Sequence, residues 1–265
     1  MRIALRLGYL GGRYHGFQRQ PGLSTVEATV REALESLGLI NGEFCYAGRT
    51  DRGVNALGQV ISFPVDPVNK KLAVPRVINS KLPRDVWTWA WAPVPESFSS
   101  RHGALWREYR YVLYGRGLDP DRMRAAARKL VGLHDFRNFS AEKKRGTVRN
   151  LMRLEIKTRG DIIVFDIKAE AFLWNMARKI VSALETIGSG ERDVEWIEDL
   201  LDPQQNRGVT AAPPEGLILM DVKYPGVEWI EDTYSKKMAS ERLSKEMRRR
   251  TALAEAVGEI YHAML

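Results

Sequence analysis

Residues 47–60 read AGRTDRGVNALGQV, and this stretch organises the first half of the chain. Apolar runs that predict β-strands lie on both sides of it. Its three glycines let the backbone turn tightly and approach a ligand closely. The stretch therefore predicts two strands joined by a tight loop, which carries Asp51 between Arg49 and Arg52.

The segments on either side of this loop predict a β-α-β-β-α-β order. Alternating or β-branched runs indicate strands, and apolar residues at helical spacing indicate helices. The expected strands are 2–7, 44–46, 60–65 and 86–94, with a helix after residue 24 and another at 74–82.

The second half repeats the same order of elements. The expected strands are 108–114, 148–156, 162–169 and 217–223, and the expected helices are 120–130, 172–187 and 194–201. Two such units predict an α+β fold with two ferredoxin-like halves, whose mainly antiparallel sheets meet at a central cleft. Such a cleft is the natural place for a site.

The C-terminal segment, residues 229–265, is charge-rich and predicts a basic helical extension. The expected division is therefore an N-terminal half (1–105), a C-terminal half (106–228) and this extension. The extension is either a solvated helix packed on the body or a surface that contacts RNA around Arg248–Arg250.

Composition narrows the partners and cofactors. The 265 residues carry a net charge of +8, and the sequence pI is about 9.6, which favours a polyanionic partner, with nucleic acid ahead of membrane. The single cysteine excludes an intramolecular disulfide and, with no signal-peptide or membrane-span pattern, indicates a cytoplasmic protein. The four histidines lack metal-ligand spacing, and the sequence has no nucleotide or flavin motif, so we expect no cofactor and no metal.

Asp51 and Arg178 are predicted to pair although they lie far apart in sequence. Arginines beside Asp51 favour its charged form. Arg178 lies in the apolar run 169–178, which predicts burial, so its guanidinium needs an anionic partner. The alternatives are a surface turn at Asp51 and a different carboxylate partner for Arg178.

The loop sequence GRTDRGVNALGQV resembles the GRTD-x-GVHA motif of the tRNA pseudouridine synthase A (TruA) family. The resemblance implies that Asp51 is the catalytic residue. Asn55 departs from the motif, because the family has histidine there and asparagine cannot titrate. The sequence leaves open whether Asp51 attacks C1′, attacks C6 or deprotonates C2′.

Four further segments resemble the family in the same order. The family's R-x-Y-R-Y segment implies that Tyr109 packs against the target uracil, and its A-F-[VL]-x-x-M-[VI]-R segment implies that Arg178 pairs with Asp51. The tripeptide at 215–217 implies that Leu217 lines the uracil pocket. Residues 14–20 resemble an RNA-contacting loop with three candidate side chains, Phe17, Gln18 and Arg19. Arg49 and Arg52 are candidates for phosphate contacts.

The resemblance covers residues 2 to about 224 and implies a homodimeric enzyme that acts on tRNA. The expected reaction isomerises uridine to pseudouridine on the 3′ side of the anticodon stem-loop, at positions 38–40. A non-catalytic RNA-binding protein with ferredoxin-like halves is the alternative, although no strand carries the RNP1 pattern. A metal-dependent nuclease would need several converging carboxylates, and the loop supplies only Asp51.

Overall fold

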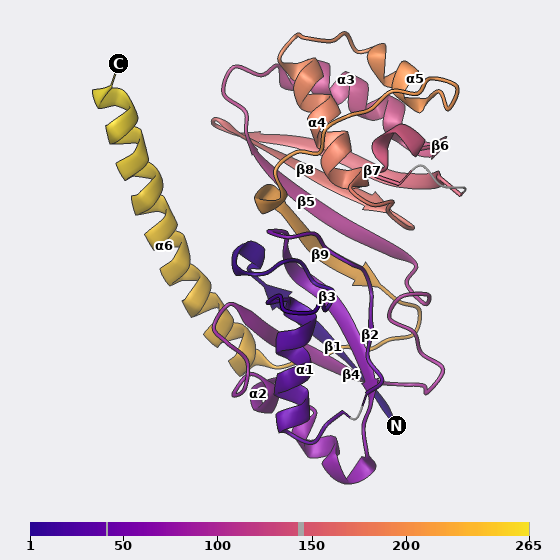
Figure 1. The fold of residues 1–265 in the computed structure, drawn as a ribbon, viewed down its shortest axis with the longest axis vertical. Coiled ribbons are helices and arrows are strands. Elements are labelled where there is room, and N and C mark those ends of the chain that lie inside the picture. Colours follow the sequence, from indigo (N-terminus) through magenta and orange to yellow (C-terminus); the bar gives the residue numbers. More distant parts are fainter. Residues whose placement is uncertain (41, 143–145, 265) are drawn as a thin grey trace.

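The computed structural model describes residues 1–40, 42–142 and 146–264. Within these residues, the protein is a mixed α+β structure built on one ten-stranded, mostly antiparallel sheet. Helices of the first half lie at one end of the molecule in Figure 1, and those of the second half lie at the other.

The first half has the predicted order of elements. These are β1 (Arg2–Tyr9), α1 (Val26–Ser36), β2 (Cys45–Tyr46), β3 (Asn55–Pro64), α2 (Pro75–Ile78) and β4 (Val86–Val94). β1 lies between β4 and β3, and β2 pairs with β3. Ile3, Leu5 and Leu7 are fully buried, as the alternating pattern predicts.

The second half adds one strand to the predicted order. Its elements are β5 (Trp106–Tyr114), α3 (Pro120–Leu130), β6 (Gly132–Asp135), β7 (Val148–Arg159), β8 (Ile162–Ala169), α4 (Met176–Gly188), α5 (Trp196–Leu201) and β9 (Leu217–Lys223). The strands run in the order β9-β5-β8-β7-β6, so β5 takes the place that β1 has in the first half. Short 3₁₀ turns occupy four further segments, Gly11–Arg13, Pro67–Leu72, Arg137–Phe139 and Pro214–Gly216.

The two halves share one continuous sheet, so the expectation of two separate sheets is wrong. β3 and β9 pair in parallel, with Asn55 opposite Ile218 and Ala56 opposite Leu219. The other neighbouring strands of the described residues run antiparallel. We call this pairing of β3 with β9 the seam. Its backbone hydrogen bonds join the two sets of strands that the sequence predicts separately.

α4 begins four residues later than the pattern predicts. Asn175 adopts a left-handed conformation (φ 65°), and the helix follows from Met176. A residue with positive φ cannot continue a right-handed helix, so residues 172–175 form a non-helical lip ahead of α4. Among the described residues, Asn175 is the one non-glycine with positive φ.

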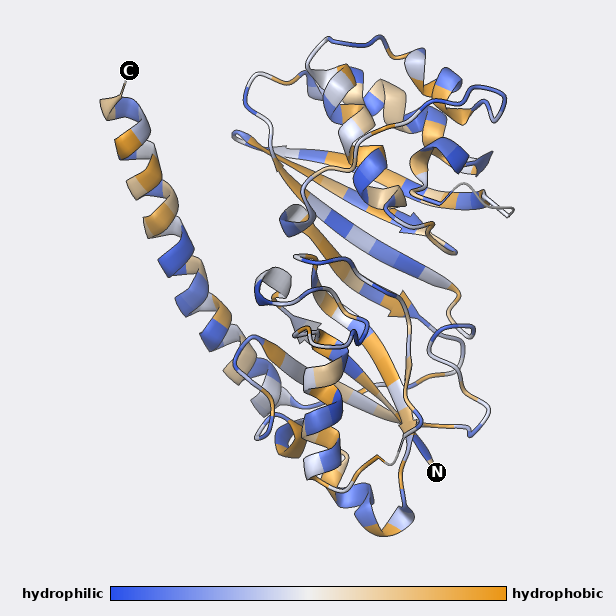
Figure 2. Cartoon of the chain, in the orientation of Figure 1, coloured by the Kyte–Doolittle hydropathy of each residue, from blue (hydrophilic) through white to orange (hydrophobic). Residues whose placement is uncertain are grey.

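The C-terminal extension is a strand, β10 (Ile230–Glu231), followed by one long helix, α6 (Thr233–Ala263). Asp232 caps the helix by accepting a hydrogen bond from Ser235 N at 2.7 Å. Within α6, only Ser235 and Ala239 of the described residues are buried, and the far end leads away from the body (Figure 1). Figure 2 shows hydrophobic and hydrophilic residues mixed along this far end.

Among the described residues, no helix combines the length and the apolar character needed to span a membrane.

The close approach of β3 to β9 at Gly58 leads to a prediction. A Cβ atom there would lie 2.9 Å from the Cα of Asp221, and closer still to the carbonyl of Met220. We expect Gly58→Ala to lower the free energy of unfolding by about 2 kcal/mol, because the two strands must separate to admit the methyl group. Thermal melting checks this, with Gly12→Ala as the control, since a Cβ at Gly12 meets nothing within 4 Å. Equal melting temperatures for both variants would contradict the close approach.

Candidate active site

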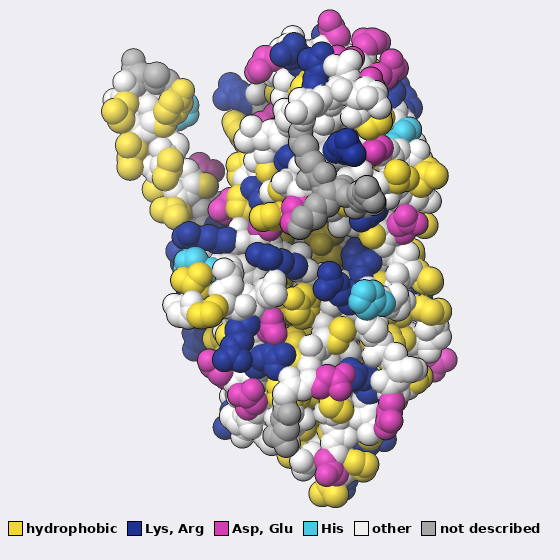
Figure 3. Space-filling model, turned by 45° about the vertical axis from the view of Figure 1, so that its right-hand side comes forward, with side chains coloured by type: hydrophobic (Ala, Val, Ile, Leu, Met, Phe, Trp, Pro, Cys, Tyr) yellow, Lys and Arg dark blue, Asp and Glu magenta, His cyan; other side chains and the backbone are white. Residues whose placement is uncertain are grey.

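A cleft lies where the two halves meet. Its volume is about 710 Å³, and its lining includes the loop before β3, the start of β5, the start of β9 and the lip before α4. Figure 3 shows a hollow near the middle of the molecule, surrounded by Lys and Arg side chains. The cleft therefore combines contributions from both halves with a basic surface.

Hydrogen bonds to the buried residues Tyr9 and Phe17 hold the loop that carries Asp51. Thr50 shares a hydrogen bond with the Tyr9 hydroxyl at 2.8 Å, and Phe17 N donates to the Thr50 carbonyl at 3.0 Å. The loop turns back through Gly53, whose φ is +84°, and Val54 N donates to the Asp51 carbonyl at 3.2 Å. Asp51 is thereby presented to the cleft with 24% of its side chain exposed.

Arg178 reaches Asp51 across the cleft, which confirms the predicted pair. Its Nη1 lies 3.1 Å from Asp51 Oδ2, and the same nitrogen lies 3.2 Å from Asn175 Oδ1. Its Nε donates to the Ala212 carbonyl at 2.6 Å. The guanidinium is 14% exposed, and its acceptors fix it in one orientation.

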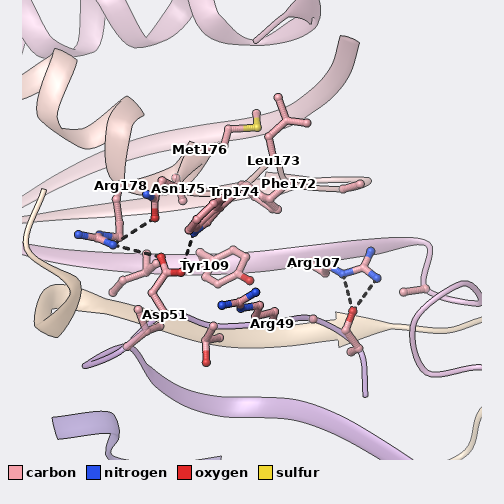
Figure 4. A pocket seen from close by; sticks show the side chains of 18 of the residues that line it. Arg49, Asp51, Arg107, Tyr109, Phe172, Leu173, Trp174, Asn175, Met176 and Arg178 are labelled. Carbon is pink, nitrogen blue, oxygen red and sulfur yellow. Dashed lines mark hydrogen bonds and ion pairs between the residues drawn. The ribbon is translucent and has the colours of Figure 1, made fainter. Parts of the chain in front are cut away.

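Trp174 makes a contact with Asp51 that the sequence analysis missed. The indole Nε1–H donates to Asp51 Oδ1 at 3.0 Å, so both carboxylate oxygens accept a hydrogen bond (Figure 4). The guanidinium carbon of Arg49 lies 5.8 Å from the Trp174 ring centroid. The sequence signal was an aromatic residue four positions before Arg178, a spacing that places both side chains on one face of the expected helix.

Tyr109 lies beside Asp51 in the cleft (Figure 4) and is 7% exposed. Its ring packs edge-on against Phe172, with 4.8 Å between centroids. Burial and the Asp51 charge raise the pKa of Tyr109 to about 12, against the opposing effect of Arg107. The hydroxyl therefore stays neutral at pH 7. Tyr111 instead donates to the Pro213 carbonyl at 2.9 Å and belongs to the core.

Arg107 forms hydrogen bonds with three backbone segments around the cleft. It donates to the carbonyls of Ala47 at 2.9 and 3.2 Å, Arg101 at 2.7 Å and Glu170 at 3.0 Å. These carbonyls belong to three different segments of the chain. Arg107 therefore positions the backbone around the site.

The other candidate residues divide by their position. Leu217 and Arg49 line the cleft with Gln18, and Leu217 is 6% exposed. Arg19 and Arg52 are exposed on loops outside the described cleft lining.

Phe17 corrects the sequence expectation of an RNA contact. Its side chain is fully buried, with its ring centroid 4.8 Å from that of Tyr46 and 6.0 Å from that of Tyr9. A base cannot stack on a ring that the core already covers.

Asn55 has a structural role at the seam. Its Oδ1 accepts from Gly11 N at 3.0 Å, and its Nδ2 donates to the Glu215 carbonyl at 2.8 Å. Asn55 thus links the start of β3 to the turn before β9. Among the described residues, no cluster of three or more potential metal ligands is found.

Comparison with known proteins identifies the class of enzyme first. Residues 126–225 match the family described as tRNA pseudouridine synthase. Three archaeal proteins, each named tRNA pseudouridine synthase A, are similar over nearly their whole length. The protein of Methanothrix thermoacetophila is 55% identical over 100% of this chain and 98% of its own, and that of Methanosarcina mazei is 47% identical over 99% and 100%. The protein of Pyrococcus abyssi is 41% identical over 91% and 92%.

The chain therefore belongs to the tRNA pseudouridine synthase A family. It is a tRNA pseudouridine synthase, an isomerase, which confirms the function expected from the GRTD loop and sets the non-catalytic alternative aside.

Proposed function

We propose that Asp51 is the catalytic carboxylate and that the enzyme isomerises uridines on the 3′ side of the tRNA anticodon stem-loop, at positions 38–40. The observation that carries the role of Asp51 is its pairing with Arg178 inside the cleft, where the carboxylate is 24% exposed. The positions are proposed from the resemblance of the loop to the family motif.

The reaction requires no external group. The N1–C1′ bond breaks, the uracil turns, a C5–C1′ bond forms, C5 gives up its proton and N1 gains one. An ionised carboxylate that is hydrogen-bonded but still open to the cleft can act on the nucleotide as nucleophile or base. The target uridine must first leave its stack, and a cleft of about 710 Å³ has room for a flipped nucleotide.

Tyr109 and Leu217 are proposed to hold the uracil beside Asp51. The Tyr109 ring offers a buried aromatic surface, and Leu217 adds an apolar contact from the start of β9. Because its pKa is raised to about 12, the Tyr109 hydroxyl can donate a hydrogen bond throughout the neutral range.

Exposed polar and basic residues around the cleft are proposed to hold the RNA backbone. Arg49 and Gln18 line the cleft, and the neighbouring loops add Arg19 and Arg52. Phosphate contacts of this kind contribute affinity without sequence preference. On α6, Glu246 pairs with Arg249 at 2.8 Å and with Arg250 at 2.8 Å, which reduces the net positive charge of that segment.

We propose that the chain comprises two ferredoxin-like halves, 1–105 and 106–228, and a basic extension, 229–265. Each half supports this by its strand order, with β4-β1-β3-β2 matching β9-β5-β8-β7. The extension is set apart because most of α6 is exposed.

We propose a homodimer, as the family resemblance implies, with the end of α6 at its interface. Leu253, Val257 and Ile260 are 56%, 58% and 64% exposed, and Met264 is 83% exposed. Their spacing of four, three and four residues places them on one helical stripe, which is the pattern of a helix that packs on another chain.

Light scattering after size exclusion tests the dimer. We expect a dimer that dissociates in the double variant Leu253→Glu with Ile260→Glu, because two charges would then enter the apolar contact. Glu255→Gln, on the opposite side of the helix, should leave the mass unchanged. A wild-type monomer would overturn the dimer, and a dimer that persists in the double variant would overturn the α6 interface.

Asp51→Asn tests the proposed function directly. We expect loss of isomerisation by at least about 10³-fold, since catalysis loses its carboxylate, whereas tRNA affinity and melting temperature stay close to those of the wild type. Tritium release from tRNA labelled at uracil C5 measures turnover, and mapping of pseudouridine in the wild-type product tests positions 38–40. Wild-type turnover in Asp51→Asn would remove Asp51 from the mechanism.

Tyr109→Phe separates the ring from the hydroxyl. We expect normal tRNA binding and a reduced kcat, because the stacking surface remains while a neutral donor is lost. Since the pKa is raised to about 12, Tyr109 does not ionise between pH 7 and 9, so the two proteins should show rate profiles of the same shape there. Full kcat in Tyr109→Phe would show that the hydroxyl takes no part.

A further inference from the structure

We propose that Trp174 is a positioning residue that holds the Asp51 carboxylate in its reactive orientation. The inference rests on the proposed role of Asp51 and extends it to a residue outside the GRTD loop. The contact that carries it is the hydrogen bond from Trp174 Nε1 to Asp51 Oδ1, 3.0 Å long.

Two donors on different oxygens fix more than one donor can. The terminal torsion of an aspartate side chain is broad, so a carboxylate held at one oxygen still rotates about its Cβ–Cγ bond. Arg178 Nη1 holds Oδ2 at 3.1 Å, and Trp174 holds Oδ1. The second donor therefore sets the plane of the carboxylate, and with it the direction of the lone pairs that remain for the substrate.

The backbone of the lip aims Trp174 at this oxygen. The left-handed conformation of Asn175, the residue after Trp174, keeps α4 from beginning before Met176. The Trp174 carbonyl accepts from Ala141 N at 3.0 Å, and Asn175 Oδ1 accepts from Arg178 Nη1 at 3.2 Å. Asparagine tolerates the left-handed region better than most other non-glycine residues, so the turn that orients Trp174 suits the residue at 175.

The indole itself is not part of the core. Trp174 is 51% exposed, and its ring lies near Arg49 at the cleft. A half-exposed ring contributes little to folding compared with a buried one, so the hydrogen bond can be removed without unfolding the protein. Loss of function in such a variant then reports on Asp51.

Trp174→Phe tests the inference, because phenylalanine keeps an aromatic ring and lacks the N–H donor. We expect kcat for pseudouridine formation to fall about 10- to 100-fold, the effect of losing one hydrogen bond to a charged group. The tRNA dissociation constant should stay within about twofold of the wild type, since the phosphate contacts are retained.

Trp196→Phe is the matched control. Trp196 also lies near an arginine, with its ring centroid 5.6 Å from the guanidinium carbon of Arg192, but it is on α5 and outside the described cleft lining. This variant should keep the wild-type kcat. Melting temperatures of both variants establish that they are folded, and Trp174→Leu replaces Trp174→Phe if the latter fails to fold.

The outcomes separate this inference from the proposed role of Asp51. A reduced kcat with unchanged tRNA affinity supports the positioning role. A wild-type or raised kcat in Trp174→Phe overturns it, as does a loss confined to tRNA affinity, which would make the ring a stacking surface. An active Asp51→Asn variant would instead defeat the proposed role of Asp51, whatever Trp174→Phe shows.

Discussion

The parallel pairing of β3 with β9 is the contact on which the site depends. Only two residue pairs form it, Asn55 with Ile218 and Ala56 with Leu219, yet it places the Asp51 loop next to the start of β9. So short a ladder contributes few backbone hydrogen bonds. The hydrogen bond from Asn55 to the Glu215 carbonyl and the ion pair between Asp51 and Arg178 also join the two halves. The residues that form the active site are therefore also among those that join the two halves.

The arginines in and near the cleft discussed above fall into two physical classes. Arg178 and Arg107 donate to protein carbonyls and to a carboxylate, which satisfies a charge that burial would otherwise penalise. Arg49, Arg52 and Arg19 are exposed, where water solvates the charge at little cost. The first class sets geometry and the second is available to a polyanion. A charge that holds the protein in place cannot also be displaced by substrate without loosening the site.

The sequence predicted the parts of the site that burial of charge demands. Arg178 in an apolar run required an anion, and Asp51 on a tight loop was a matching group. The family resemblance favoured Asp51 over another carboxylate, and the structure bears this pair out. Trp174 was missed, although its spacing of four residues from Arg178 would place both on one face of the expected helix. In the structure Trp174 lies outside the helix, before the left-handed Asn175. The prediction for Phe17 was wrong because an aromatic residue flanked by polar residues on a loop was expected to be exposed. In the structure its ring packs against Tyr9 and Tyr46. The continuous sheet was missed because β3 and β9 pair over 150 residues apart, and neither strand carries a signal for its partner.

The departure at Asn55 follows from the hydrogen bonds that the position must make. The backbone N–H of Gly11 donates to the Asn55 side chain, and the Glu215 carbonyl accepts from it. An asparagine amide offers an acceptor and a donor in a fixed plane, and a neutral imidazole also offers one of each through its two nitrogens. Either residue can therefore close the seam, whereas a charged imidazole would present two donors and leave Gly11 N without its acceptor. Asparagine has no charged form, so it keeps the acceptor for Gly11 N at low pH as well. The position thus works as a fixed link between β3 and the turn before β9, and the chemistry is left to the residues that face the cleft.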